Sequence, residues 1–309
     1  MAFETVQIAP GIYHLQSGAN TGLITSGNET ILIDAGLDDD TGRRIKKAVD
    51  ALGLTITHLV ITHAHADHFG GASYLRRNMP PFVVSAPRLE AAIVANPQLE
   101  GIALSAGAVS FDPLNEKFTL APACDVDQII APGTGLNSRV GGELATVISL
   151  HGHSPQQIGV LTKNGEVLFC ADGFLPLATL TKYPIPFTAH MGFALETLTG
   201  LDEKVRSGTI LAAGHGTHLS GDAARVVIEA NVAALRRVID ATESALQDGP
   251  LTEADATFAV AAALGDKMTM PVGYYLGRAT IQAALVYLYE QKRAMVNNDG
   301  AGKMRWRLM

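Results

Sequence analysis

Cysteine is scarce in this chain, and long apolar runs are missing. Only Cys124 and Cys170 occur among 309 residues, which is too few for a disulfide framework. No stretch approaches the roughly 20 apolar residues that a membrane-spanning helix requires. The first residues lack the basic and apolar segments of a secretory signal. These absences predict a cytoplasmic protein that has no membrane partner.

Positive charge is scarce as well. The chain has 23 lysines and arginines against 30 acidic residues, which gives a net charge of −7. Its single basic cluster, residues 43–47, has the spacing of a solvated helix face. A nucleic-acid binder needs a basic surface to neutralise phosphates, so we exclude that class of partner and expect a small-molecule substrate. The 47% of hydrophobic residues can fill the core of one large domain or two small ones.

What the chain does contain is a dense run of metal-binding side chains. Residues 63–68 read His-Ala-His-Ala-Asp-His and directly follow an apolar stretch. Residues two apart in a strand point to the same side, so His63 and His65 can face one ion together. Asp67 and His68 stand where a helix should begin, and they can face a second ion. Neutral imidazole and carboxylate are the donors of zinc and iron sites.

Further candidate ligands follow three other apolar runs. They are His153, Asp172 and His215, and each has a glycine beside it in sequence. Strand ends that open into loops are where sites on sheet scaffolds are built. The other histidines have no comparable partners, and we interpret them as loop, surface or packing residues: His14, His58, His151, His190 and His218. Of these, His190 and His218 could lie near the mouth of a site.

This pattern as a whole resembles the metallo-β-lactamase superfamily. The match consists of H-x-H-x-D-H, a distant Gly-His-Ser, an aspartate after an apolar run, and Gly-His-Gly, over roughly residues 5–220. The spacing is most similar to the subgroup that contains the quinolone-signal-response thioesterase. The resemblance implies an α+β fold, an αβ/βα four-layer sandwich with a helical C-terminal extension. It divides the chain into a catalytic domain, 1–221, and a helical extension packed on it, 222–309.

The resemblance also implies two divalent metal ions. Zinc is favoured, and iron or manganese would also fit such donors. The resemblance implies that the first ion is bound by His63, His65 and His153. It implies that the second ion is bound by Asp67, His68 and His215, and that Asp172 bridges both ions. Asp34 matches the family's aspartate that supports the H-x-H-x-D-H loop from outside, as metal-bound imidazoles usually require.

The activity that follows is hydrolysis of an ester-like bond, with a thioester or lactone favoured. Two divalent ions about 3.5 Å apart can share a hydroxide near neutral pH, and this hydroxide would attack the carbonyl. Asp67 would act as the catalytic residue by orienting the water and passing its proton to the leaving group. Two alternatives stay open: a β-lactamase, which the missing export signal disfavours, and a regulatory ligand-binding protein whose hydrolysis is incidental.

Periodicity predicts the elements around these motifs. A strand over 57–62 should lead into a helix over 68–77, in which Gly70 and Gly71 would permit a close backbone approach. We expect another strand at 117–120. The alanine-rich residues 86–115 should be helical in part and could line a substrate pocket.

The C-terminal residues predict apolar helices over 222–247, from Thr252 onward and over 274–292. They could pack on the sandwich, cover the active site with Tyr274 or Tyr275 near the substrate, or form a homodimer surface. Residues 296–309 read as a polar tail without an assigned role.

Overall fold

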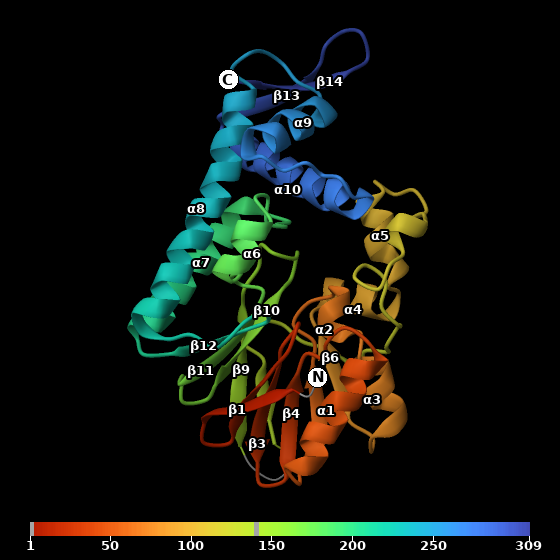
Figure 1. The fold of residues 1–309 in the computed structure, drawn as a ribbon, viewed down its shortest axis with the longest axis vertical. Helices are drawn as coiled ribbons and strands as arrows, with labels where there is room; N and C mark the ends of the chain where they lie inside the picture. Colours follow the sequence, from red (N-terminus) through yellow and green to blue (C-terminus); the bar gives the residue numbers. More distant parts are fainter. Residues whose placement is uncertain (1–2, 139–141) are drawn as a thin grey trace.

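The computed structural model describes residues 3–138 and 142–309, and its centre is a sandwich of two β-sheets (Figure 1). The first sheet has the strand order β1-β2-β3-β4-β5-β6-β7, and the second has the order β12-β11-β10-β9-β8. Helices cover the outer face of each sheet. The predicted α+β class and αβ/βα four-layer sandwich are confirmed.

The first sheet changes from antiparallel to parallel at β4. Its strands are β1 (Glu4–Ala9), β2 (Ile12–Gln16), β3 (Thr21–Ser26), β4 (Glu29–Ile33), β5 (Thr55–Val60), β6 (Val83–Ala86) and β7 (Gln128–Ile129). The helix α1 (Asp39–Ala51) connects β4 to β5, which are parallel and in register at Ile33 and Val60. Because carboxyl ends of parallel strands share one sheet edge, Asp34 and the histidine run emerge side by side.

The second sheet is antiparallel except at its edge. Its strands are β8 (Gly135–Asn137), β9 (Glu143–Ser149), β10 (Ile158–Thr162), β11 (Val167–Ala171) and β12 (Ile210–Ala213). The helices α6 (Leu177–Lys182) and α7 (Met191–Arg206) connect β11 to β12, which pair in parallel. Apolar side chains such as Ile33, Val60, Val160 and Phe169 fill the space between the two sheets.

The C-terminal helices are those the periodicity predicts. They are α8 (Gly221–Ala245), α9 (Glu253–Leu264) and α10 (Pro271–Glu290). Ile228, Leu235 and Ile239 of α8 are buried in one cluster with Leu168 and other residues of the second sheet. In Figure 1, α10 crosses from α8 towards α5, so the extension reaches over one end of the sandwich. The division into domains 1–221 and 222–309 stays a prediction.

Residues 86–115 are partly helical, as predicted, and form α4 (Arg88–Ala95), α5 (Gln98–Leu104) and the 3₁₀ turn η1 (Asp112–Leu114). The expected strand at 117–120 is wrong. Those residues form a turn in which the N–H of Thr119 donates to the carbonyl of Glu116, and Phe118 is exposed. The apolar residues of this segment do not pair with a neighbouring strand.

The predicted helix over 68–77 is two helices, α2 (Ala66–Phe69) and α3 (Ala72–Asn78). A Cβ on Gly70 would lie 1.8 Å from the carbonyl oxygen of Leu37, and one on Gly71 would lie 2.3 Å from that of Ala35. The two glycines therefore permit a close backbone approach, as predicted. The partner is the loop after β4.

The C-terminal residues form a hairpin where a polar tail was expected. Its strands are β13 (Ala294–Asn298) and β14 (Met304–Leu308). Trp306 is buried, and its backbone exchanges hydrogen bonds of 2.7 and 2.9 Å with that of Leu251. Among the described residues, no helix is long and apolar enough to cross a membrane.

Candidate metal centre

Strand ends from both sheets converge on one point. The run 63–68 follows β5, His153 lies between β9 and β10, and Asp172 and His215 follow β11 and β12. All seven predicted ligands are brought together in three overlapping groups, in each of which the donor atoms lie within 4.8 Å of one another: His63–His65–His153, His63–His68–Asp172 and Asp67–His68–His215. The convergence agrees with the prediction, and the ligand roles themselves stay a proposal.

The first group consists of three imidazoles. Nδ1 of His65 lies 3.0 Å from Nε2 of His63 and 2.9 Å from Nε2 of His153. Burial lowers the pKa of all three rings, that of His153 to about 4, and neighbouring histidines add to this for His63 and His153. The rings are therefore uncharged, and each can present a lone pair to a shared cation.

The third group, Asp67–His68–His215, combines acid and base. Nε2 of His215 lies 3.4 Å from Oδ2 of Asp67, and Nε2 of His68 lies 4.0 Å from Oδ1 of the same carboxylate. Burial would raise the pKa of Asp67, but His68 and His215 lower it to about 2. Asp172 raises the pKa of His215 to about 10. The neighbouring histidines thus keep the carboxylate of Asp67 ionised.

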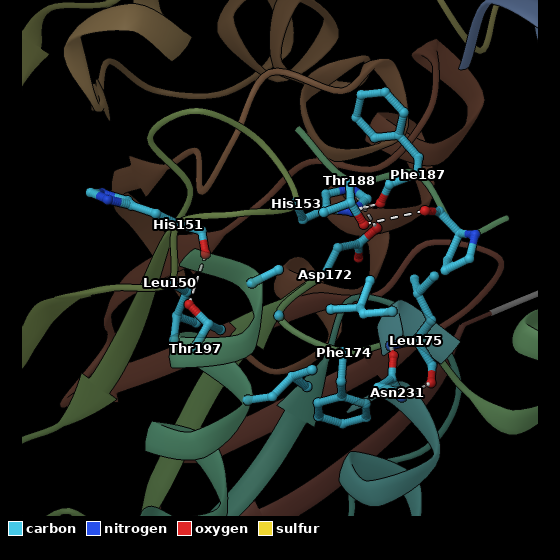
Figure 2. A pocket seen from close by; sticks show the side chains of 15 residues that line it. Leu150, His151, His153, Asp172, Phe174, Leu175, Phe187, Thr188, Thr197 and Asn231 are labelled. Carbon is cyan, nitrogen blue, oxygen red and sulfur yellow. Dashed lines mark hydrogen bonds and ion pairs between the residues drawn. The ribbon is translucent and has the colours of Figure 1, made fainter. Parts of the chain in front are cut away.

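Asp172, a member of the remaining group, lies between the first and the third group. Its Oδ1 is 3.4 Å from Nε2 of His68, and its Oδ2 is 3.4 Å from Nε2 of His153 and 3.5 Å from Nε2 of His215. Figure 2 shows Asp172 and His153 pointing toward one another.

Two atoms of the centre test whether metal ions fit. Nε2 of His68 and Oδ1 of Asp172 are buried and form no hydrogen bond with any described residue, although they lie 3.4 Å from each other. Such atoms cost free energy unless something meets them. Five imidazoles and two carboxylates around one point are the donor set of divalent transition-metal ions. The residues therefore fit divalent metal ions, and the number of ions stays a prediction.

Outer hydrogen bonds fix how the rings point. Nδ1 of His68 lies 2.8 Å from Oδ2 of Asp34, that of His153 lies 3.2 Å from the carbonyl of Phe187, and that of His215 lies 2.6 Å from the carbonyl of Gly18. Each bond leaves Nε2 free to face the centre. Asp34 therefore lies where the sequence predicts support for the loop.

Asp34 has a second task in this loop. Its carboxylate accepts hydrogen bonds of 2.8 Å from the backbone N–H and from the hydroxyl of Thr62. Its φ of 60° is unusual for a residue with a side chain. Strain of this kind persists where surrounding contacts over-determine the backbone.

Sequence reasoning missed Glu90, which ties two histidine loops together. One carboxylate oxygen accepts from the N–H of Ala64 at 3.0 Å, and the other accepts at 2.8 Å from the hydroxyl of Ser154 and from the N–H of Gln156. Phe187 was missed as well, although its ring contacts those of His65 and His153. No motif marks either residue.

The remaining histidines lie outside the group, as interpreted from the sequence. Nε2 of His14 lies 3.1 Å from the carbonyl of Ala213, and burial lowers the pKa of His14 to about 4. His58 bonds the hydroxyl of Ser85, and His190 accepts from the first turn of α7. Figure 2 shows His151 pointing away from Asp172, across a small cavity of about 30 Å³.

A larger cavity of about 350 Å³ adjoins the centre at His65. Residues of α4, α5 and α10 line it, and many of its lining side chains are apolar: Ile93, Ala103, Leu104, Phe187 and Ala279. Tyr275 lines it too. Some of residues 86–115 and Tyr275 therefore line a cavity next to the centre, and its use as a substrate pocket stays a prediction.

Comparison with known proteins places this geometry in a family. The sequence model of the Metallo-beta-lactamase superfamily matches residues 16–215, and the chain belongs to that superfamily. The predicted family is therefore confirmed.

The chain aligns with different fractions of its curated relatives. The uncharacterized protein YobT of Bacillus subtilis is 27% identical over 67% of this chain and 87% of its own length. The atrochrysone carboxyl ACP thioesterase of Passalora fulva is 38% identical, but over only 23% of this chain and 21% of its own length. The hydroxyacylglutathione hydrolase of Nitrobacter hamburgensis is 28% identical over 45% and 42%. The chain thus spans less than half of the length of these two named enzymes.

Solved structures share the fold along nearly the whole chain. A metallo-beta-lactamase family protein from Thermus thermophilus aligns with 98% of this chain and 100% of its own, with a TM-score of 0.71 and 17% identity. A beta-lactamase domain protein from Burkholderia ambifaria aligns over 99% and 93%, with a TM-score of 0.69 and 17% identity. Both alignments include the C-terminal helices.

Proposed function

We propose that this member of a hydrolytic superfamily is a dinuclear metal-dependent hydrolase that cleaves an ester-like bond, with a thioester or lactone favoured. The observation that carries the proposal is the convergence of seven donor residues, two of them with buried unsatisfied atoms, beside an apolar cavity. When bound, the two ions would polarise a carbonyl and activate water. Nitrogen-rich donors favour zinc.

The residues of the centre would have different roles in this reaction. His63, His65 and His153 would hold one ion and Asp67, His68 and His215 the other, while the carboxylate of Asp172 would contact both. The side chain of Asp67 is 26% exposed whereas that of Asp172 is 6% exposed. Asp67 can therefore face substrate, accept a proton from water at Oδ1 and release it to the leaving group.

Two observations favour a thioester or lactone. The cavity beside His65 offers mainly apolar side chains to an acyl group, and such pockets take ligands with a large apolar part. One curated relative carries a thioesterase name and another a hydrolase name. A β-lactamase activity has no separate support, because the structural likenesses show the fold alone.

Elemental analysis combined with a substrate panel tests the proposal. We expect about two divalent ions per chain and hydrolysis of thioesters or lactones in preference to β-lactams and phosphodiesters. His153→Ala should lose metal and nearly all activity, and His151→Ala is its matched control because that ring points away from the centre. A metal-free wild type that keeps full activity, or a fully active His153→Ala enzyme, would contradict the proposal.

A second pair of variants distinguishes a water nucleophile from a thiol nucleophile. Asp67→Ala should nearly abolish hydrolysis even where some metal remains, whereas Cys170→Ala should keep most activity. Cys170 is completely buried, and burial raises the pKa of its thiol, so it is inert. An inactive Cys170→Ala enzyme that folds and binds two ions would point to a covalent thiol mechanism.

A further inference from the structure

The cavity beside His65 contains two polar groups that neither the fold nor the metal centre uses. Glu100 of α5 and Gln282 of α10 both line it. Oε1 of Gln282 is buried and has no hydrogen-bond partner in the part of the chain that the structure describes. Within the described residues, the carboxyl group of Glu100 has no hydrogen bond or ion pair either.

The other two carboxylates and the guanidinium that line the same cavity have partners. Glu90 accepts three hydrogen bonds from the histidine loops. The guanidinium of Arg278 donates to Glu253 at 2.7 Å, so its charge is already neutralised. An anionic group would therefore find no free cation among the lining residues, and burying it unpaired would be costly.

Both unused groups offer an acceptor. The buried atom of Gln282 is its amide oxygen. Burial raises the pKa of Glu100 well above its usual value, and the carboxylates of Asp67 and Glu90 add to this. A protonated carboxyl group still keeps its carbonyl oxygen as an acceptor, so Glu100 can accept a hydrogen bond in either state.

We propose that Glu100 and Gln282 form a specificity subsite for an uncharged acyl substrate, in which they accept hydrogen bonds from a hydroxyl or N–H group on the acyl chain. The hydrocarbon part of that chain lies against Ile93, Leu104 and Ala279, and the ester-like bond lies at the His65 end of the cavity. This inference rests on the proposed function, because it takes the metal centre as the place of cleavage.

A matched set of octanoyl thioesters tests the subsite. The set contains the unsubstituted acyl chain, chains with a hydroxyl at the third, fourth or fifth carbon, and the corresponding keto compounds. A hydroxyl donates a hydrogen bond and a keto group does not. Wild-type kcat/KM should be about tenfold higher for the best hydroxy compound than for its keto and unsubstituted partners, which is the value of roughly one hydrogen bond.

Variants then assign the preference to the two residues. Glu100→Leu and Gln282→Leu should each reduce the hydroxy preference to about threefold or less, mainly through a higher KM for the hydroxy compound. Glu100→Gln keeps an acceptor and should retain most of the preference. Glu116→Leu, at an exposed glutamate outside the cavity, is the control and should behave as wild type.

Binding of the corresponding octanamides, measured by calorimetry, separates this inference from the proposed function. Tighter binding of hydroxyoctanamide that Glu100→Leu removes would support the subsite even if no thioester were cleaved. Cleavage without any hydroxy preference, or an equal preference for hydroxy and keto compounds, would overturn it. Loss of preference in Glu116→Leu would also overturn it, because the effect would then not belong to the cavity.

Discussion

Single hydrogen bonds decide which ring nitrogen of each histidine is available to the centre. Asp34 bonds Nδ1 of His68, and two backbone carbonyls bond Nδ1 of His153 and His215. A ring that turned over would exchange these bonds for an unsatisfied nitrogen, which is costly in a buried place. The surrounding residues therefore orient the ligands before any ion binds. Their substitution should lower metal affinity although every ligand is still present.

Glu90 offers the sharpest test of this preparation. Glu90→Leu would leave the N–H groups of Ala64 and Gln156 and the hydroxyl of Ser154 without their acceptor, at a cost of about 3 kcal/mol or more in unfolding free energy. Metal affinity should fall as well, because both histidine loops move. Denaturant unfolding and metal titration measure the two effects. Glu203→Leu, at an exposed position of α7, is the control, and equal stabilities of the two variants would refute the role of Glu90.

The sequence predicts the ligands and does not predict Glu90, for a physical reason. A metal centre demands particular residue types at strand ends, so the run 63–68 stands out by residue type. His153, Asp172 and His215 stand out by type and by their glycine neighbours. Glu90 is an ordinary helical glutamate until α4 places it beside Ala64 and Ser154, 26 and 64 residues away. Only tertiary structure brings those groups together.

At the scale of elements, the break between α2 and α3 sets the position of the histidine run. The N–H of Ala35 donates to the carbonyl of His68 at 2.6 Å, and this contact requires the chain after β4 to touch the glycines between the two helices. The sequence reveals the glycines but not the break, because helix periodicity continues across it.

Alanine substitutions at two glycines should change stability in opposite directions. Gly70→Ala would place its Cβ 1.8 Å from a backbone oxygen, so something must shift, at a cost of about 2 kcal/mol or more. Gly200→Ala, inside α7 with no atom within 4 Å of its new Cβ, should stabilise the protein by about 0.5–1 kcal/mol. Thermal and denaturant unfolding measure both changes. A Gly70→Ala protein as stable as the wild type would refute the close approach.

The position of α10 across the cavity leads to a prediction about acyl length. Ala279→Phe should fill part of the roughly 350 Å³ space, so kcat/KM should fall at least tenfold for octanoyl thioesters and much less for acetyl thioesters. Metal content should not change, because Ala279 is not a ligand. Ala262→Phe on the exposed side of α9 is the control. Equal losses for short and long substrates would argue against α10 as a pocket wall.

For the whole molecule, the centre joins two halves that are distant in sequence. The first sheet supplies the run 63–68 and Asp34, and the second supplies His153, Asp172 and His215. The resemblance predicts this architecture because the order of the motifs is diagnostic of the family. It does not predict the C-terminal hairpin, whose buried Trp306 is the chain's single tryptophan in a segment that otherwise looks polar.

Because ions bound there would contact both halves, metal removal should destabilise the entire fold. A ligand at a thousand times its Kd stabilises the native state by about 4 kcal/mol, so chelation should lower Tm by roughly 5–10 °C at this chain length. Calorimetry with and without chelator, followed by addition of zinc, measures the change. In Asp172→Asn the difference in Tm with and without chelator should shrink to about 2 °C or less. The reason is that the contact of this side chain with the first and third ligand groups is weakened. The expectation would be wrong if chelation removed the metal from loaded wild-type protein, as elemental analysis would show, and Tm did not change. Each half would then keep its fold without the ions.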